Sequence, residues 1–126
     1  MVLIFGGAYQ GKLDYAMERY GLTESDVYKC GGGNTDTPEK KKIIYEIDKW
    51  ILALVRADID PAEAVSRFID SHPDAVVICN DISGGIVPID PVMRKWREAV
   101  GRALAAVSQK SDEVVRLFCG IPTVIK

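Results

Sequence analysis

The stretch MVLIFGGAYQGKL, residues 1–13, decides the fold predicted for this chain. A compact apolar run from Val2 to Phe5 stops at a glycine-rich segment, and Gly6, Gly11 and Lys12 match the G-x-x-x-x-G-K part of the phosphate-binding loop pattern. In such loops, backbone N–H groups surround phosphate oxygens and the lysine reaches the terminal phosphates. The sequence therefore predicts a strand, a phosphate-binding turn and a helix at its start.

The predicted nucleotide contacts are the residues of this loop. They are Gly6, Gly7, Ala8, Tyr9, Gln10, Gly11, Lys12 and Leu13. Lys12 is also a candidate catalytic residue, because the loop lysine contacts the β- and γ-phosphates. The pattern requires Ser or Thr at its last position, where a hydroxyl binds magnesium, and Leu13 has no hydroxyl. The loop is therefore degenerate, and a Mg²⁺ ion bound there would lack one ligand.

Length and charge limit the partners of the protein. A chain of 126 residues can bury its own core, so we expect one P-loop α/β domain over residues 1–126. With 16 Lys and Arg against 18 Asp and Glu, the net charge is −2, and no basic surplus is present for a nucleic-acid backbone. We expect no nucleic-acid partner. A phosphate site made locally suits a small nucleotide, GTP or ATP.

Cysteines and apolar runs indicate the cellular setting. Cys30, Cys79 and Cys119 are odd in number and widely separated, which fits neither a disulfide framework nor a zinc pattern. No apolar run approaches the roughly 20 residues that span a bilayer, and the run after Met1 is too short for a signal-peptide core. We expect a cytoplasmic protein with reduced thiols and no membrane partner.

Apolar periodicity and capping residues predict the remaining elements. They are a helix at 12–20, a short strand at 27–30, a helix opened by Asp60 and Pro61, a buried strand at 75–80, a helix from Asp90 to about 109, and a strand at 113–119. Because strands alternate with helices, we predict a three-layer α/β fold, similar to P-loop NTPases, with a mainly parallel sheet.

Residues 43–57 allow two interpretations. One is a single long helix from Pro38, favoured by its charged start and the absence of a breaker. The other is a strand ending at Ile47 with Asp48 capping a helix, favoured by the β-branched residues. In the second interpretation Asp48 follows an apolar strand, as the acid of a second nucleotide motif does, and is the candidate catalytic and magnesium-binding carboxylate. In the first it is an ordinary surface acid.

Three further positions follow predicted elements. Gly31 to Gly33 form a loop at the carboxyl end of a strand, where ligands of open α/β sheets bind, although a plain flexible connection fits equally well. Asp81 follows the strand at 75–80 and is the second candidate magnesium ligand, directly or through water. His72, the one histidine, has no cysteine near it, so a charge at a helix end is a better interpretation than a metal ligand.

Three segments resemble the adenosylcobinamide kinase/adenosylcobinamide-phosphate guanylyltransferase family. They are GGAYQGK at 6–12, VVICNDISGGIVPIDPVMRKWREAVGRALAAV at 76–107 and DEVVRLFCGIPTVIK at 112–126. The IDKW segment around Asp48 is also similar to these enzymes, which favours the strand interpretation. The resemblance implies an enzyme of cobalamin biosynthesis that phosphorylates the aminopropanol hydroxyl of adenosylcobinamide and then transfers GMP from GTP through a guanylylated histidine. It also implies a homotrimer.

The chain departs from this family in its middle. It is shorter than typical members between the second strand and Asp48, where the family carries its guanylylated histidine, and His72 lies in a different segment. We therefore expect no guanylyl transfer by the family route. Three functions stay open: a nucleotide-binding or cobinamide-binding protein without turnover, which we place first, a reduced cobinamide kinase that uses ATP or GTP, and an oligomeric scaffold with an empty loop.

Overall fold

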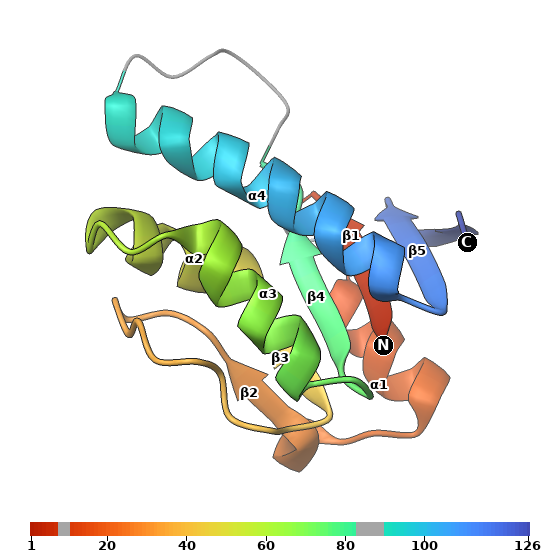
Figure 1. Cartoon of the computed structure of the whole chain (residues 1–126). Helices are drawn as coiled ribbons and strands as arrows, with labels where there is room; N and C mark the ends of the chain where they lie inside the picture. Colours follow the sequence, from red (N-terminus) through yellow and green to blue (C-terminus); the bar gives the residue numbers. More distant parts are fainter. Residues whose placement is uncertain (8–10, 83–89) are drawn as a thin grey trace.

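The computed structural model describes residues 1–7, 11–82 and 90–126. Its elements in chain order are β1 (Val2–Gly6), α1 (Lys12–Tyr20), the 3₁₀ turn η1 (Glu24–Asp26), β2 (Val27–Lys29), β3 (Ile43–Tyr45), α2 (Ile47–Arg56), α3 (Pro61–Ser71), β4 (Val76–Asn80), α4 (Pro91–Lys110), β5 (Glu113–Phe118) and β6 (Ile121–Val124). The strands form one sheet in the order β2-β3-β4-β1-β5-β6 (Figure 1). Its pairs are parallel except β5 with β6.

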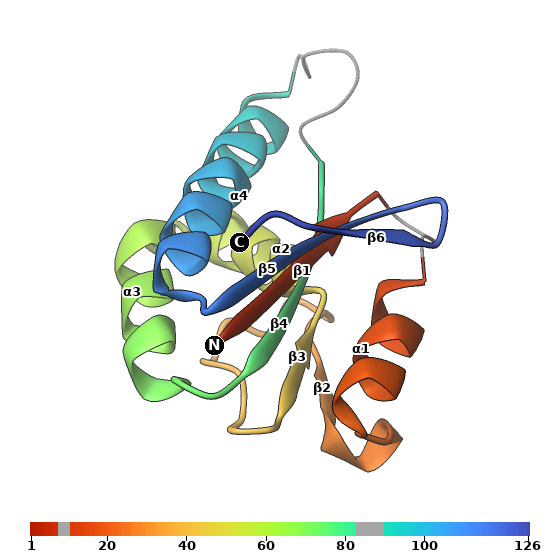
Figure 2. The same cartoon turned by 90° about the vertical axis from the view of Figure 1, so that its right-hand side faces the viewer.

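Helices cover both faces of this sheet. Figure 2 shows α1 on one face and α2, α3 and α4 on the other. Successive residues of β1 point to opposite sides: Leu3 belongs to the apolar cluster under α2, α3 and α4, and Ile4 belongs to the cluster under α1. A strand buried on both faces is continuously apolar, which explains the character of β1 and β4. The predicted three-layer α/β fold of the P-loop NTPase type is confirmed.

The segment around Asp48 is a strand followed by a helix, but its boundaries differ from the prediction. The strand ends at Tyr45, and α2 starts at Ile47 with Glu46 as its N-cap residue. Glu46 adopts a left-handed conformation, with φ 58°, which turns the chain sharply and starts the helix early. The prediction that the strand reaches Ile47 and that Asp48 caps the helix is therefore wrong. Asp48 lies in the first turn of α2.

The predicted starts of α3 and α4 are confirmed by their caps. The side chain of Asp60 accepts a hydrogen bond from the backbone N–H of Ala62, and Asp90 does the same for Val92. In both helices a proline occupies the first turn, where no backbone donor is needed. Each such cap stabilises its helix by about 1 kcal/mol.

The end of the chain forms a strand that the sequence did not predict. After β5, Cys119 and Gly120 turn the chain with φ values of 49° and 75°, and β6 returns antiparallel to β5. Pro122 argues against a strand, but β6 lies at the edge of the sheet, where proline is tolerated. The apolar side chains of Phe118 and Ile121 are exposed on this hairpin.

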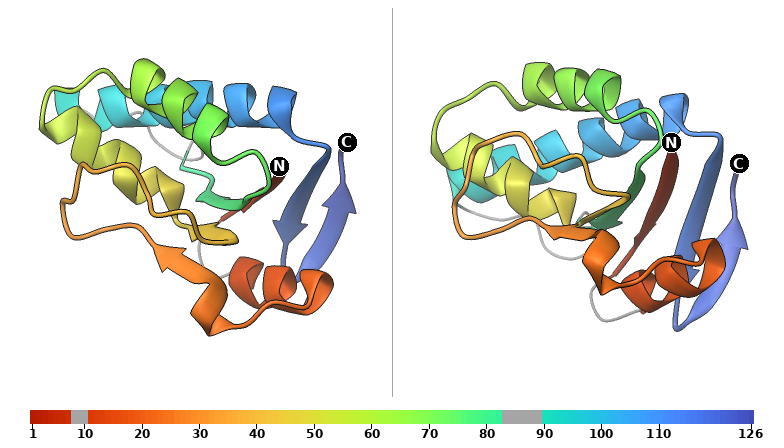
Figure 3. Two further views of the ribbon diagram at one scale, coloured as in Figure 1. Left: turned by 60° about the horizontal axis from the view of Figure 1, so that its bottom comes forward. Right: turned by 90° about the horizontal axis from the view of Figure 1, so that it is seen from below.

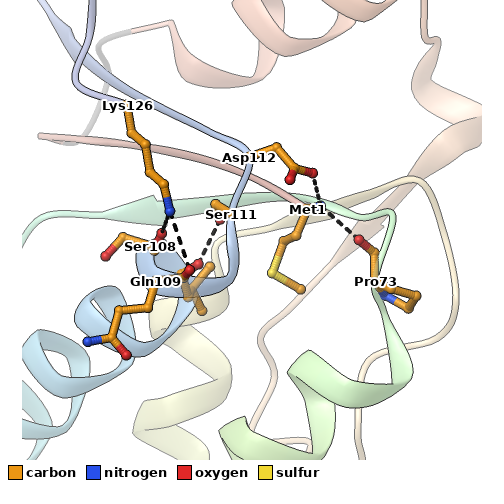
Figure 4. Close-up of polar contacts among 8 residues, drawn as sticks. Met1, Pro73, Ser108, Gln109, Ser111, Asp112 and Lys126 are labelled. Atoms are coloured by element: carbon orange, nitrogen blue, oxygen red, sulfur yellow. Dashed lines mark hydrogen bonds and ion pairs between the residues drawn. The ribbon is translucent and has the colours of Figure 1, made fainter.

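Polar contacts fasten the two ends of the chain near the amino ends of the parallel strands. The N-terminal ammonium of Met1 donates to the carbonyl oxygen of Pro73 at 2.7 Å and lies 3.3 Å from a carboxylate oxygen of Asp112 (Figure 4). Lys126 donates to the carbonyl oxygens of Ser108 and Gln109 in the last turn of α4. In the described ranges, no helix combines the length and the apolar character that crossing a membrane requires.

His72 fastens the loop before β3 at this same end of the sheet. It follows the last residue of α3, and its Nε2 donates to the carbonyl oxygen of Pro38 at 2.9 Å. The Nδ1 atom lies 2.7 Å from the hydroxyl of Ser71, and the ring stacks on Phe68 with centroids 4.4 Å apart. Both ring nitrogens thus have protein partners, and His72 has a structural role.

Candidate functional site

The first loop connects β1 to α1 in the arrangement that the sequence predicted. Gly6 ends β1, and Gly11 is the N-cap residue of α1 with φ 80°. A Cβ atom at Gly6 would lie 2.2 Å from the carbonyl oxygen of Leu117, so only glycine fits at this position. Ala8, Tyr9 and Gln10, which the sequence also predicts as nucleotide contacts, lie outside the described residues.

Lys12 is a buried cation at the start of α1. Its side chain is 4% exposed, and Nζ donates to the carbonyl oxygen of Gly7. Burial lowers the pKa of Lys12, and the nearby Asp48, Cys79 and Glu46 oppose this shift only in part. Desolvation thus outweighs the attraction of the carboxylates. An anion placed beside Nζ would favour its charged form.

A network of polar side chains lies at the carboxyl ends of β3 and β4. The backbone N–H of Asn80 donates to Oδ1 of Asp48 at 3.0 Å, and its side-chain amide donates to Oδ2 of Asp48 at 3.3 Å and to Glu46 at 3.2 Å. Asp48 is 2% exposed. Burial raises the pKa of Asp48, and the hydrogen bonds from Asn80 lower it in part. The fold therefore brings Asp48 to the same edge of the sheet as Lys12.

Glu46 belongs to this network, and the sequence prediction missed it. Its carboxylate lies 3.0 Å from Nζ of Lys49 and accepts the hydrogen bond from Asn80. The signal was present in the sequence, because Glu46 comes directly after Ile43, Ile44 and Tyr45, whereas Asp48 comes two residues later. Placing the strand end at Ile47 assigned the acidic role to Asp48 alone.

Carboxylates at this edge of the sheet are suitable ligands for magnesium, which prefers oxygen atoms. Within residues 1–7, 11–82 and 90–126, no group of three or more His, Cys, Asp or Glu could hold a metal by itself. Both carboxylate oxygens of Asp48 already accept hydrogen bonds from Asn80. Magnesium is commonly bound through one or two carboxylates together with waters and substrate phosphates. Glu46 and Asp48 therefore fit Mg²⁺ only as part of a complex with phosphate.

Asp81 and Leu13 are the remaining residues that the sequence predicts for the site. The backbone N–H of Asp81 donates to the carbonyl oxygen of Gly6 at 2.7 Å, which joins the end of β4 to the end of β1, and its side chain is half-buried. Leu13 is also half-buried and packs against the apolar cluster under α1. Replacement of the expected hydroxyl by an apolar side chain thus contributes to packing at this position.

Two thiols near the network are not poised for nucleophilic chemistry. Cys30 and Cys79 are buried, and burial raises the pKa of Cys30 to about 12 and that of Cys79 well above its ordinary value. Since the thiolate is the nucleophile, these side chains stay protonated and inert at neutral pH.

A cavity of about 430 Å³ opens beside Asp48. It lies between α2, the loop from Gly31 to Gly33, and Trp96 of α4. Figure 3 shows this loop, which follows β2, running alongside α2. The indole N–H of Trp96 donates to the carbonyl oxygen of Asp48 at 2.8 Å. Asp48 thus belongs both to the polar network and to the wall of the cavity.

Comparison with protein families gives a match over residues 46–125, to the family described as cobinamide kinase / cobinamide phosphate guanyltransferase. The matched part is more than half of the chain. The chain belongs to this family. The family that the sequence resemblance predicted is confirmed. Its membership supports a function in cobalamin biosynthesis similar to that of cobinamide kinase/guanyltransferase. The match contains the whole polar network but not the first loop, and a search of curated proteins gave no match.

Proposed function

We propose that this member of the cobinamide kinase family binds a nucleoside triphosphate, GTP or ATP, in its first loop, with the phosphates against Lys12. One observation carries the proposal: Lys12 is a buried cation whose desolvation is only partly offset by the carboxylates near it. A phosphate would supply the missing countercharge. The N-terminus of α1, which has no side-chain cap among the described residues, presents its positive dipole end and adds to this attraction.

Each residue of the site has a role in this proposal. Backbone N–H groups between Gly6 and Leu13 surround the phosphates, and Lys12 binds the terminal ones. Glu46, Asp48 and Asp81 are the carboxylates that would hold Mg²⁺ together with the phosphates. The ion, when bound, would neutralise phosphate charge. The proposed unit is one domain over residues 1–126, assembled as a homotrimer as the family resemblance implies.

Guanylyl transfer through histidine is not part of the proposed function. His72 is the one histidine of the chain. It is buried at the amino end of the sheet, where it donates to Pro38 and stacks on Phe68. Covalent catalysis needs a nucleophile that reaches the transferred group. The position of His72 therefore supports a protein that binds nucleotide without this second activity.

Phosphorylation of cobinamide is the second candidate function, and the cavity beside Asp48 favours it. Phosphoryl transfer depends mainly on positioning and on charge neutralisation, which Lys12 and the carboxylates could supply without the hydroxyl missing at Leu13. A substrate hydroxyl in the cavity would lie next to Asp48, which lines it.

Thermal unfolding with nucleotide tests the binding proposal. GTP, ATP and GDP are added at millimolar levels with and without Mg²⁺, to the wild-type protein and to Lys12→Met, which keeps the alkyl chain. A ligand at a hundredfold excess over its dissociation constant stabilises the native state by about 2.7 kcal/mol. We expect stabilisation of the wild type and none of Lys12→Met. Lys42→Met, at an exposed position, is the matched control and should respond like the wild type.

The outcomes separate the candidate functions. If no nucleotide stabilises the protein, nucleotide binding is contradicted. The oligomeric scaffold with an empty loop is then the remaining candidate function. Binding followed by appearance of phosphorylated cobinamide, measured by chromatography, would establish the kinase. Binding without product over many hours would identify a nucleotide-binding protein without turnover.

A further inference from the structure

Asn80, the last residue of β4, directs its N–H donors at two carboxylates. Its backbone N–H donates to Oδ1 of Asp48 at 3.0 Å. Its side-chain amide donates to Oδ2 of Asp48 at 3.3 Å and to Oε2 of Glu46 at 3.2 Å. A carboxylate oxygen only accepts, so the amide nitrogen, and not the amide oxygen, faces both acids. Asn80 thus joins two acids that lie at the start of α2.

The side-chain amide of Asn80 faces both acids as a bridging cation would. Glu46 and Asp48 are buried, and buried carboxylates need hydrogen-bond donors or cations to compensate for lost solvation. The amide supplies such donors without supplying a positive charge. A cation that binds both carboxylates would therefore compete with the amide for Oδ2 of Asp48 and Oε2 of Glu46.

Lys49 is the second partner of Glu46, and it is easier to displace. Its Nζ lies 3.0 Å from the same Oε2 atom. Because Lys49 is exposed and has a flexible stem, its ammonium can move into water. The main chain of Asn80 is fixed, since β4 pairs with β1 and its N–H is bound to Asp48. The amide of Asn80 is therefore the contact that limits the access of a metal ion to the two acids.

Asn80 is also next to the start of the phosphate loop. It pairs with Gly6 in the register of β4 with β1, and the backbone N–H of Asp81 donates to the carbonyl oxygen of Gly6 at 2.7 Å. The charge of Asp48 acts on Lys12. A phosphate bound at Lys12 would thus bring acceptor oxygens to the same end of the sheet as the amide.

We propose that Asn80 blocks magnesium from Glu46 and Asp48 until nucleotide binds. Without nucleotide, the amide donates to both acids. With phosphates at Lys12, the amide donates to a phosphate oxygen and releases one oxygen of each acid. The inference rests on the proposed function, because nucleotide at Lys12 offers the amide this other acceptor. Asn80 is a positioning residue, since it acts on the metal ion through the two carboxylates.

A purely structural amide is the competing explanation. In that case Asn80 only fastens the start of α2 to the end of β4. Its loss would lower the free energy of unfolding and leave the affinity for a divalent cation unchanged. Blocking by the amide predicts instead that its loss increases this affinity in the absence of nucleotide.

Binding of Mn²⁺ without nucleotide tests the inference on the full chain. Mn²⁺ replaces Mg²⁺ at oxygen ligands, and its free form is measured by electron paramagnetic resonance. The variant is Asn80→Ala, which removes the amide but keeps the backbone donor to Asp48. The matched control is Gln109→Ala, which removes an exposed amide in the last turn of α4. Urea unfolding verifies that both variants fold.

We expect Asn80→Ala to bind Mn²⁺ about tenfold more tightly than the wild type, and Gln109→Ala to bind it like the wild type. By linkage, the factor by which Mg²⁺ increases nucleotide affinity should fall about tenfold in Asn80→Ala. Equal Mn²⁺ affinity of the wild type and a folded Asn80→Ala would overturn the inference.

A measurement on the wild type keeps the inference testable if Asn80→Ala does not fold. The side-chain amide of Asn80, one of two asparagines in the chain, is observed by ¹H–¹⁵N NMR. Its resonances should stay unchanged with millimolar Mg²⁺ alone and shift with Mg²⁺ and GTP or ATP. A shift with Mg²⁺ alone, or none with Mg²⁺ and a nucleotide that binds, would overturn the inference. No binding of nucleotide would contradict the proposed function itself, and the nucleotide-free Mn²⁺ comparison would still decide whether Asn80 blocks the metal.

Discussion

Buried polar groups gather at both ends of the parallel strands, and their partners differ. At the amino end, His72 and the ammonium of Met1 donate to backbone carbonyl oxygens of Pro38 and Pro73. At the carboxyl end, burial lowers the pKa of Lys12 and raises the pKa of Asp48, so both groups are shifted towards their neutral forms. Perturbed groups of this kind cluster at binding and catalytic sites. At the amino end, His72 and the Met1 ammonium thus have protein partners, whereas the groups at the carboxyl end are suited to a charged ligand.

The largest expected effect on stability comes from removing the hydrogen bond of His72 at the amino ends of the parallel strands. His72→Phe keeps the stacking on Phe68 but removes the donor to Pro38, which leaves a buried carbonyl oxygen unsatisfied. We expect the free energy of unfolding to fall by about 2 kcal/mol, measured by urea unfolding, with nucleotide affinity unchanged. His72→Gln, whose amide can donate in place of Nε2, should recover part of the loss. A change in nucleotide affinity in His72→Phe would show that the two ends are coupled.

At the carboxyl ends of the strands, we expect a substitution that increases the free energy of unfolding. Lys12→Met removes a buried cation, and at pH 7 the protein without ligand should gain about 1 kcal/mol of stability while it loses nucleotide binding. Because the folded pKa of Lys12 lies below the unfolded value of 10.5, the unfolded chain binds more protons between these two values.

The pH dependence sharpens this prediction. The contribution of Lys12 to wild-type stability should rise with pH through that window, so the advantage of Lys12→Met should shrink as pH approaches 10.5. Urea unfolding of both proteins at a series of alkaline pH values measures the difference. Parallel pH profiles, or a variant that is less stable at pH 7, would show that the carboxylates fully compensate the charge.

The smallest expected effect concerns the missing hydroxyl. Leu13→Thr restores it, and Leu13→Val has the same shape without it. If the hydroxyl is the main defect of the loop, the threonine variant should bind nucleotide several-fold more tightly than the valine variant in the presence of Mg²⁺ and equally in its absence. Both should lose about 1 kcal/mol of stability, because Leu13 packs against the cluster under α1. Equal magnesium dependence would place the defect elsewhere in the site.

The sequence predicted those elements that local chemistry determines. Asp60 and Asp90 cap helices that begin with proline, and the runs that form β1 and β4 are apolar because both faces of these strands are buried. Gly21 ends α1 in the left-handed conformation expected of a glycine after a helix.

Other features depend on tertiary structure and were not predictable in this way. The left-handed conformation of Glu46 contradicts residue preference and is imposed by the connection from β3 to α2. β6 includes Pro122 and becomes a strand only because β5 offers an edge. The hydrogen bonds of Asn80 to Asp48 and Glu46 join residues more than thirty positions apart. The sequence therefore located the site through Lys12 and Asp48, whereas the contacts that join Asn80 to Asp48 and Glu46 required the fold.

The two tryptophans occupy different environments, with a consequence for spectroscopy. Trp50 is packed in the core against Phe68, with ring centroids 5.7 Å apart, while Trp96 lines the cavity beside Asp48. With Trp50 replaced by phenylalanine, the remaining tryptophan fluorescence would arise from Trp96 alone, at the cavity. Its emission maximum would then report the polarity of the cavity, and a ligand that binds there would shift it.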